Sequence, residues 1–117
     1  MKPVFNILSV QYAGNSIEAI LSVDAFSEIF QGHFPDQAVV PGACMLQMVK
    51  DLLAGTLKTQ MRLLKADNIK FLNLITPAAD SLQLKINYQQ INGQLKVSAN
   101  LVANEIVCMK FSGIFSY

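Results

Sequence analysis

A single apolar stretch with helical spacing, which begins at Pro41-Gly42, most constrains what this chain can fold into. Apolar side chains recur there every three or four residues, whereas the segments on either side alternate with the period of strands. Because proline needs no N–H partner at the first helical position, the helix is expected to begin at Pro41 and to end near Gly55. Apolar residues occur around nearly its whole circumference, which predicts burial on most sides.

Strand-like segments precede and follow this helix. They span about 5–13, 17–23, 61–71, 81–91 and 94–117, and the last divides near Asn104-Glu105 into two strands. Gly14-Asn15-Ser16 is a good turn, and Asn92-Gly93 is the strongest hairpin indication, since both residues tolerate positive φ. The order β-β-α-β-β-β-β predicts an α+β fold with antiparallel strands around one long helix, in a single domain over residues 1–117.

Composition limits the class of protein. The chain has 117 residues, of which 52% are apolar and 15% charged, so it has ample material for a core and little for a disordered tail. The charge is low for a small domain, which predicts that a second subunit covers part of its apolar surface. A net charge of +1 suggests neither a nucleic-acid binder nor a polyanionic protein.

Cysteine usage and the N-terminus bear on the compartment. Cys44 and Cys108 lie among apolar residues, so we expect free thiols and a reducing cytoplasm rather than a disulfide framework. The N-terminal residues lack the continuous apolar stretch of a signal peptide, and no run approaches the length of a membrane span. One histidine and no Cys-x-x-Cys predict no metal site, and without a Gly-rich phosphate loop no cofactor is expected.

The segment before the helix holds the only histidine, His33. An imidazole exchanges a proton near neutral pH, and the helix start at Gly42 offers N–H groups to a carbonyl oxygen or an anion. A structural histidine is the alternative, but the rigid backbone around His33 favours a functional role. Cys44 lies in the first helical turn, where a thiolate is stabilised; we interpret it as a buried, inert thiol, since no second histidine is present to activate it.

Two stretches resemble the β-hydroxyacyl-acyl carrier protein dehydratases, which have the hot-dog fold. The first is Gly-His-Phe-Pro at 32–35, followed by Val-Val-Pro-Gly at 39–42 and the apolar helix. The second runs from Ile-Lys-Phe at 69–71 through Ile-Thr-Pro at 75–77 to a strand start at Leu82, with Ala78-Ala79 in place of the family's tight glycine. The resemblance implies a curved antiparallel sheet wrapped around a central helix. It also implies a homodimer or heterodimer whose two sheets join edge to edge.

The same resemblance implies the dehydration of a 3-hydroxyacyl thioester. His33 would take the Cα proton as general base, and the Gly42 N–H would polarise the thioester carbonyl. In the family, a carboxylate six residues after the proline of Pro-Gly protonates the leaving hydroxyl. Here that position is Gln47, which can hydrogen-bond a hydroxyl but cannot donate and recover a proton.

Asp51 lies one turn beyond Gln47 on the same helix face, about 6 Å along the axis, and is the alternative acid. Plainer interpretations stay open for both residues. Gln47 could satisfy a neighbouring backbone group, and Asp51 could be a solvated or salt-bridged helix acid.

Two further sets of residues follow from the resemblance. Phe34, Phe71 and Met45 are expected to line an apolar tunnel for the acyl chain. Four of the nine basic residues fall within a short span and could dock an acidic acyl carrier protein, or could be only a solvated loop and strand edge. They are Lys58, Arg62, Lys65 and Lys70.

Four functions therefore remain open. The first is a hydro-lyase that acts on 3-hydroxyacyl thioesters of fatty-acid or related acyl-chain biosynthesis. The second is a half-catalytic or non-catalytic hot-dog subunit, which contributes His33 to a heterodimer whose partner supplies the helix Glu or Asp. The third is a hot-dog thioesterase, and the fourth is an acyl-binding module. The identity of the acid separates the first two.

Overall fold

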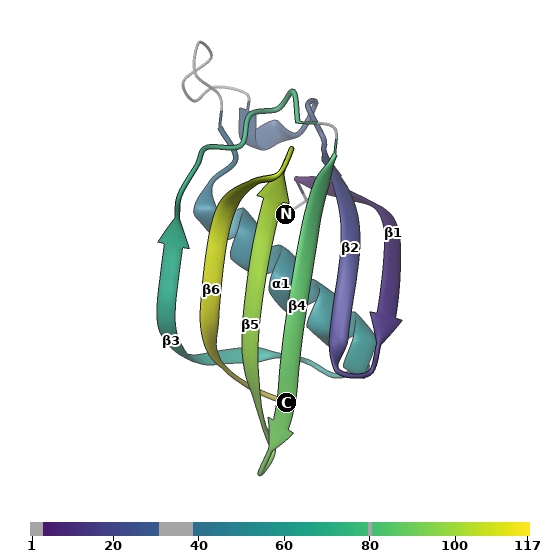
Figure 1. Ribbon diagram of the computed structural model, residues 1–117, viewed down its shortest axis with the longest axis vertical. Helices are drawn as coiled ribbons and strands as arrows, with labels where there is room; N and C mark the ends of the chain where they lie inside the picture. The colour runs from purple at the N-terminus through teal and green to yellow at the C-terminus, as the bar shows by residue number, and fades with distance from the viewer. Residues whose placement is uncertain (1–3, 31–38, 80) are drawn as a thin grey trace.

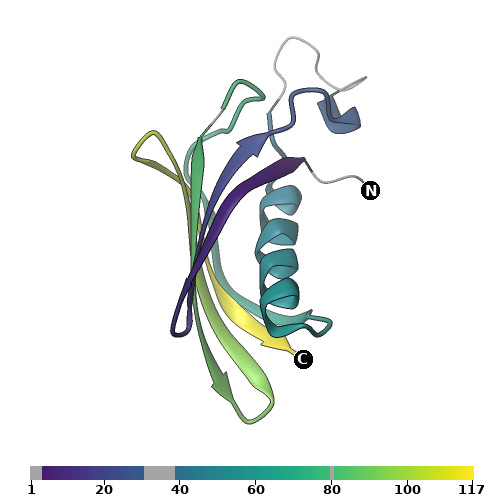
Figure 2. The ribbon, with the colours of Figure 1, turned by 90° about the vertical axis from the view of Figure 1, so that its right-hand side faces the viewer.

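A sheet of six antiparallel strands curves around one long helix (Figures 1 and 2). The structure, a computed structural model, describes residues 4–30, 39–79 and 81–117. Its elements are β1 Phe5–Ala13, β2 Ser16–Val23, η1 Glu28–Phe30, α1 Gly42–Leu57, β3 Arg62–Phe71, β4 Leu82–Ile91, β5 Gln94–Ala103 and β6 Ile106–Ser116. The predicted α+β hot-dog architecture and element order are confirmed; the short 3-10 turn η1 was not predicted.

The strands lie in the order β1-β2-β4-β5-β6-β3. The chain therefore leaves the sheet after β2, forms α1, and returns as β3 at the opposite edge, beside β6 (Figure 1). The expected hairpin between β4 and β5 is confirmed, with φ values of 50° at Asn92 and 77° at Gly93. The expected division near Asn104-Glu105 is the turn between β5 and β6.

The core lies between the concave side of the sheet and one face of α1. Alternate residues of β2 point into it, from Ile17 to Val23, as their sequence pattern predicts. The buried helix residues are Cys44, Met45, Met48, Val49, Leu52 and Leu53. This helix face and the inward residues of β2, β4, β5 and β6 form one continuous cluster.

The prediction that α1 is buried on most sides is wrong for the single chain. Ala43, Gln47 and Asp51 are exposed, and Leu46 and Lys50 are only partly covered. The reason is geometric, because the sheet curves over one side of the helix, and Figure 2 shows no strand on the other side.

Both ends of α1 differ slightly from the prediction. Pro41 is the extended residue before the helix, with ψ of 145°, and not its first helical residue. The helix continues past Gly55 to Leu57 and stops because Lys58 adopts the left-handed conformation, with φ of 53°. The N–H groups of Lys58 and Thr59 then donate to the carbonyl of Ala54, a common way to close a helix. In the described part of the chain, no helix has the length and apolarity needed to cross a membrane.

The position of Gly55 inside the helix gives a stability test with a matched control. An added Cβ meets no atom within 4 Å at either Gly55 or Gly93, so packing does not separate the two sites. Gly55→Ala should raise the free energy of unfolding by about 0.5–1 kcal/mol, because alanine loses less backbone entropy in a helix. Gly93→Ala should lower it by about 1–2 kcal/mol, since its φ of 77° is left-handed. Urea titration measures both. A destabilising Gly55→Ala would contradict the observed helix end.

Candidate functional site

The two stretches singled out in the sequence meet at the N-terminal end of α1. The N–H of Val40 donates to the carbonyl of Ile75 with an N···O distance of 2.7 Å. The ring of Phe71, the last residue of β3, lies directly against Gly42, where an added Cβ would come within 2.5 Å of the ring. The helix start, the end of β3 and the β3–β4 connection thus form one corner of the molecule, which we call the Gly42 corner.

Hydrogen-bond donors are concentrated at this corner. The first N–H groups of an α-helix have no acceptor within the helix, and no side chain caps this end of α1 among the described residues. The N–H of Cys44 donates to the carbonyl of Pro41 over 3.0 Å, so the donors in question are the N–H groups of Gly42 and Ala43. Such a helix end can bind a carbonyl oxygen on which negative charge develops. Because Gly42 has no side chain, the Phe71 ring can occupy the space where a Cβ would be.

Two predicted site residues fall outside the structural description. His33 and Phe34 belong to the segment 31–38, which is not among the described residues. Their predicted roles, as general base and as a tunnel residue, remain predictions.

An apolar cleft of about 250 Å³ lies between the exposed side of α1 and strands β3 and β6. Its lining consists of Ala43, Leu46, Gln47, Lys50, Leu63, Phe111 and Phe115. The rings of Phe111 and Phe115 meet edge to face, with centroids 6.0 Å apart. Gln47 and Lys50 are the polar side chains of this lining. The position of the family's acid therefore borders an apolar cleft, and Ala43, the residue after Gly42, belongs to the same lining.

Gln47 and Asp51, the two candidates for the role of the acid, are hydrogen-bonded to each other. The amide Nε2 of Gln47 donates to Oδ1 of Asp51 over 2.8 Å. Gln47 thus bonds a side chain rather than a neighbouring backbone group, whereas Asp51 is an exposed helix acid, as its plainer interpretation has it. Hydrogen bonds at this spacing of four residues are common on helices. That spacing was available in the sequence and could have indicated the pair.

The other predicted tunnel residues lie in different surroundings. Phe71 is 51% exposed and contacts the helix start, whereas Met45 is 4% exposed and belongs to the core. Neither lines the cleft. The aromatic residues that do line it come from β6 and were not predicted, because they belong to no motif.

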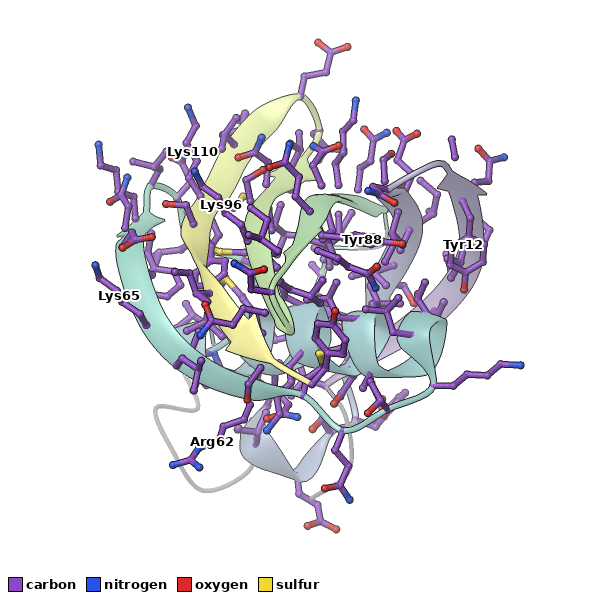
Figure 3. All side chains as sticks on the ribbon, turned by 90° about the horizontal axis from the view of Figure 1, so that it is seen from below. Tyr12, Arg62, Lys65, Tyr88, Lys96 and Lys110 are labelled. Atoms are coloured by element: carbon purple, nitrogen blue, oxygen red, sulfur yellow. The ribbon has the colours of Figure 1, made fainter. Side chains whose placement is uncertain are left out.

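The four basic residues singled out in the sequence are spread along one edge rather than clustered. Lys58 closes α1, Arg62 begins β3, and Lys70 lies near the far end of β3. Lys65 forms an exposed ion pair with Asp67 at 3.2 Å. Figure 3 shows Arg62 apart from Lys65, Lys96 and Lys110, which project from the outer side of the sheet.

The cysteines offer no activated nucleophile. Desolvation by burial raises the pKa of the Cys44 thiol above its ordinary value. The same effect dominates at Cys108, where a backbone hydrogen bond lowers the pKa in part. Both side chains are buried and free of disulfides, so the expected burial of Cys44 is confirmed, and its inertness stays a prediction.

Similar sequences include two named dehydratases. The chain is 32% identical over 85 residues to the 3-hydroxyacyl-[acyl-carrier-protein] dehydratase FabZ of Wolbachia pipientis wMel. The aligned region covers 67% of this chain and 59% of that enzyme. It is 30% identical over 104 residues to FabZ of Bacillus cereus (strain AH187), and the aligned region covers 81% of this chain and 72% of that enzyme. The chain therefore matches less than two thirds of the length of the Wolbachia enzyme.

Solved structures share the fold. The dehydratase heterocomplex ApeI:P from Xenorhabdus doucetiae has a TM-score of 0.80 and 21% identity, with full coverage of both chains. A putative thioesterase from Ralstonia eutropha JMP134 has a TM-score of 0.66 and 18% identity, and covers 93% of this chain and 83% of that chain. At these identities the likeness concerns the fold alone.

The family match covers most of the chain. The sequence model of the ApeI-like family, described as ApeI dehydratase, matches residues 9–111. This span runs from β1 into β6 and includes α1, the Gly42 corner and the cleft residues up to Phe111. The chain belongs to the ApeI-like dehydratase family.

Proposed function

We propose that this chain is a dehydratase subunit that acts on 3-hydroxyacyl thioesters within a dimer of two hot-dog chains. The observation that carries the proposal is that Ala43, the residue after Gly42 in the first turn of α1, lines the same apolar cleft as Gln47. The corner provides N–H donors for a thioester carbonyl, and the cleft beside it provides apolar walls for an acyl chain. Membership of the ApeI-like family supports this function.

The reaction breaks the Cα–H and Cβ–O bonds, forms the Cα=Cβ double bond and releases water. His33 would remove the Cα proton, while the N–H groups at Gly42 stabilise the negative charge that develops on the thioester oxygen. The leaving hydroxyl must receive a proton. Gln47, at the position of the family's acid, can donate a hydrogen bond, but its neutral amide does not act as an acid that transfers a proton.

The acid would therefore come from a partner chain with a Glu or Asp on its central helix. The exposed face of α1 and the open cleft give such a partner a surface to cover. The structurally similar ApeI:P is itself a dehydratase heterocomplex, which supports this arrangement. A homodimer in which Asp51 supplies the proton is the second candidate, favoured by the contact of Asp51 with Gln47.

The substrate would be carried on an acyl carrier protein in the cytoplasm. Lys70 is adjacent to Phe71 at the Gly42 corner and pairs with Lys110 across β3 and β6. Like charges directly opposite each other repel, so an acidic carrier would gain from binding there. Two buried free thiols are consistent with a reducing compartment.

The central experiment is a turnover assay on 3-hydroxyacyl thioesters, with the chain alone and with a second hot-dog chain that carries a helix carboxylate. We expect no turnover alone and turnover in the complex. His33→Ala should reduce the rate of the complex by roughly 10²–10⁴-fold, the usual contribution of a general base. Full activity of the chain alone, abolished by Asp51→Asn, would show instead that Asp51 is the acid.

A double substitution tests whether the chain alone lacks turnover because it lacks the acid. Gln47→Glu by itself places a carboxylate against Asp51, and like charges four residues apart repel on a helix. When Gln47→Glu is combined with Asp51→Asn, the side-chain amide of the asparagine can instead donate a hydrogen bond to the new glutamate. We expect this double variant to confer dehydratase activity on the chain alone and to change the complex little. No activity in the double variant would place the defect elsewhere.

The Gly42 corner can be tested by a double-mutant cycle on stability. Gly42→Ala brings a Cβ into the ring of Phe71, and because that ring is half-exposed and can move, the cost should lie near the low end of overpacking, about 1 kcal/mol. In a Phe71→Ala background the clash disappears, so the cost should fall and the cycle should give a coupling of at least about 0.5 kcal/mol. Denaturant unfolding measures all four proteins. Additive effects would show that Phe71 does not rest on Gly42 in solution.

Thiol labelling tests whether cysteine chemistry has any part in the mechanism. Because burial raises the pKa of both thiols, they should stay protonated and react slowly with iodoacetamide at pH 7.5. Labelling should become complete only when urea unfolds the chain. Modification of folded Cys44 within minutes, with loss of turnover, would contradict this expectation.

A further inference from the structure

We propose that Asp51 is a positioning residue, which fixes the side-chain amide of Gln47 so that its oxygen serves as the acceptor for the substrate hydroxyl. The inference rests on the proposed function and assigns roles to the two candidates together. Instead of competing for the place of the acid, the pair would hold the β-hydroxyl in place while another group protonates it.

The direction of the hydrogen bond follows from the chemistry of its acceptor. An ionised carboxylate has no hydrogen to donate, so the end of the amide that faces Asp51 must be the nitrogen. The distance of 2.8 Å from Nε2 to Oδ1 is typical of a bond to a charged acceptor. With Nε2 committed to Asp51, the carbonyl Oε1 is the end of the Gln47 amide that remains available as an acceptor.

The orientation matters because Gln47 lines an apolar cleft. Once a partner chain covers the cleft, a hydroxyl without a hydrogen-bond partner is costly, whereas one that donates to Oε1 is satisfied. A reversed amide would present N–H groups and offer no acceptor to the hydroxyl proton. The cleft should therefore distinguish 3-hydroxyacyl groups from acyl groups without the hydroxyl, and this discrimination should depend on Asp51.

The chain contains a matched control for this bond. On the outer face of the sheet, Nε2 of Gln83 donates to Oε1 of Glu18 over 2.7 Å, also between exposed side chains. Neither residue lines the cleft. Glu18→Ala therefore removes a bond of the same chemistry at a place where it cannot orient a substrate.

The experiment uses the full chain in its active assembly and two unreactive probes, a 3-hydroxyacyl amide and the matching saturated acyl amide. Asp51→Ala should weaken binding of the hydroxy probe by about 3- to 10-fold, the range of one hydrogen bond, and leave the saturated probe unchanged. Asp51→Asn should keep most of the discrimination, because the oxygen of asparagine can accept the same bond. Glu18→Ala should change neither probe. Calorimetry gives the affinities.

A spectroscopic measurement on the same variants separates positioning from proton transfer. The side-chain amide cross peak of Gln47 in a 15N spectrum, assigned from its loss in Gln47→Leu, should shift in Asp51→Ala and stay in place in Glu18→Ala. An unshifted peak in Asp51→Ala would overturn the proposed orientation. So would equal weakening of both probes, and so would loss of turnover in Asp51→Asn with probe binding intact, since that result would make the carboxylate itself the acid.

The two proposals fail differently. If the assembly turns over no thioester but still distinguishes the two probes through Asp51, the dehydratase function fails and the orientation of Gln47 stands. If turnover occurs and the wild-type cleft does not distinguish the probes, the dehydratase function stands and the role of the pair is refuted.

Discussion

The burial of one face of α1 in the concave side of the sheet is the interaction on which the rest of the molecule depends. Val49 and Leu53 lie fully inside, and each such aliphatic side chain contributes about 1.5–3 kcal/mol on burial. A sheet that wraps one side of a helix leaves the other side uncovered. The apolar cleft beside Gln47 is a consequence, because it lies between the uncovered side of the helix and strands β3 and β6.

The Gly42 corner connects that core to the N–H groups at the helix start, which the proposed function assigns to the thioester carbonyl. The hydrogen bond from Val40 to Ile75 and the contact of Phe71 with Gly42 join segments some 30 residues apart in the chain. They set where the N-terminal end of α1 lies relative to the sheet edge. Donor groups at a helix end are useful in catalysis only when they are already aimed at the developing charge, so this fixed corner matters more than the helix end alone.

The sequence predicted what local patterns determine and missed what tertiary contacts determine. Alternation fixed the inward face of β2, and Asn92-Gly93 fixed the β4–β5 turn, because each depends on neighbouring residues only. The end of α1 was misplaced at Gly55 because a lysine takes the left-handed conformation usually left to glycine. The exposed helix face was missed because the apolar pattern of a helix does not tell which side its own sheet covers and which side a second chain would cover.

Within the candidate site, the helix position of Gln47 could be predicted from the sequence, whereas its surroundings could not. Phe111 and Phe115 reach the cleft only because β6 lies next to β3, a pairing that no motif encodes. The groups found in this site explain why the proposal separates substrate binding from proton transfer. The described part of this site offers apolar walls, N–H donors and an oriented acceptor. In the proposed function these groups would bind and align a hydroxyacyl thioester, whereas the protons that the reaction moves would be carried by His33 and by a carboxylate from the second chain.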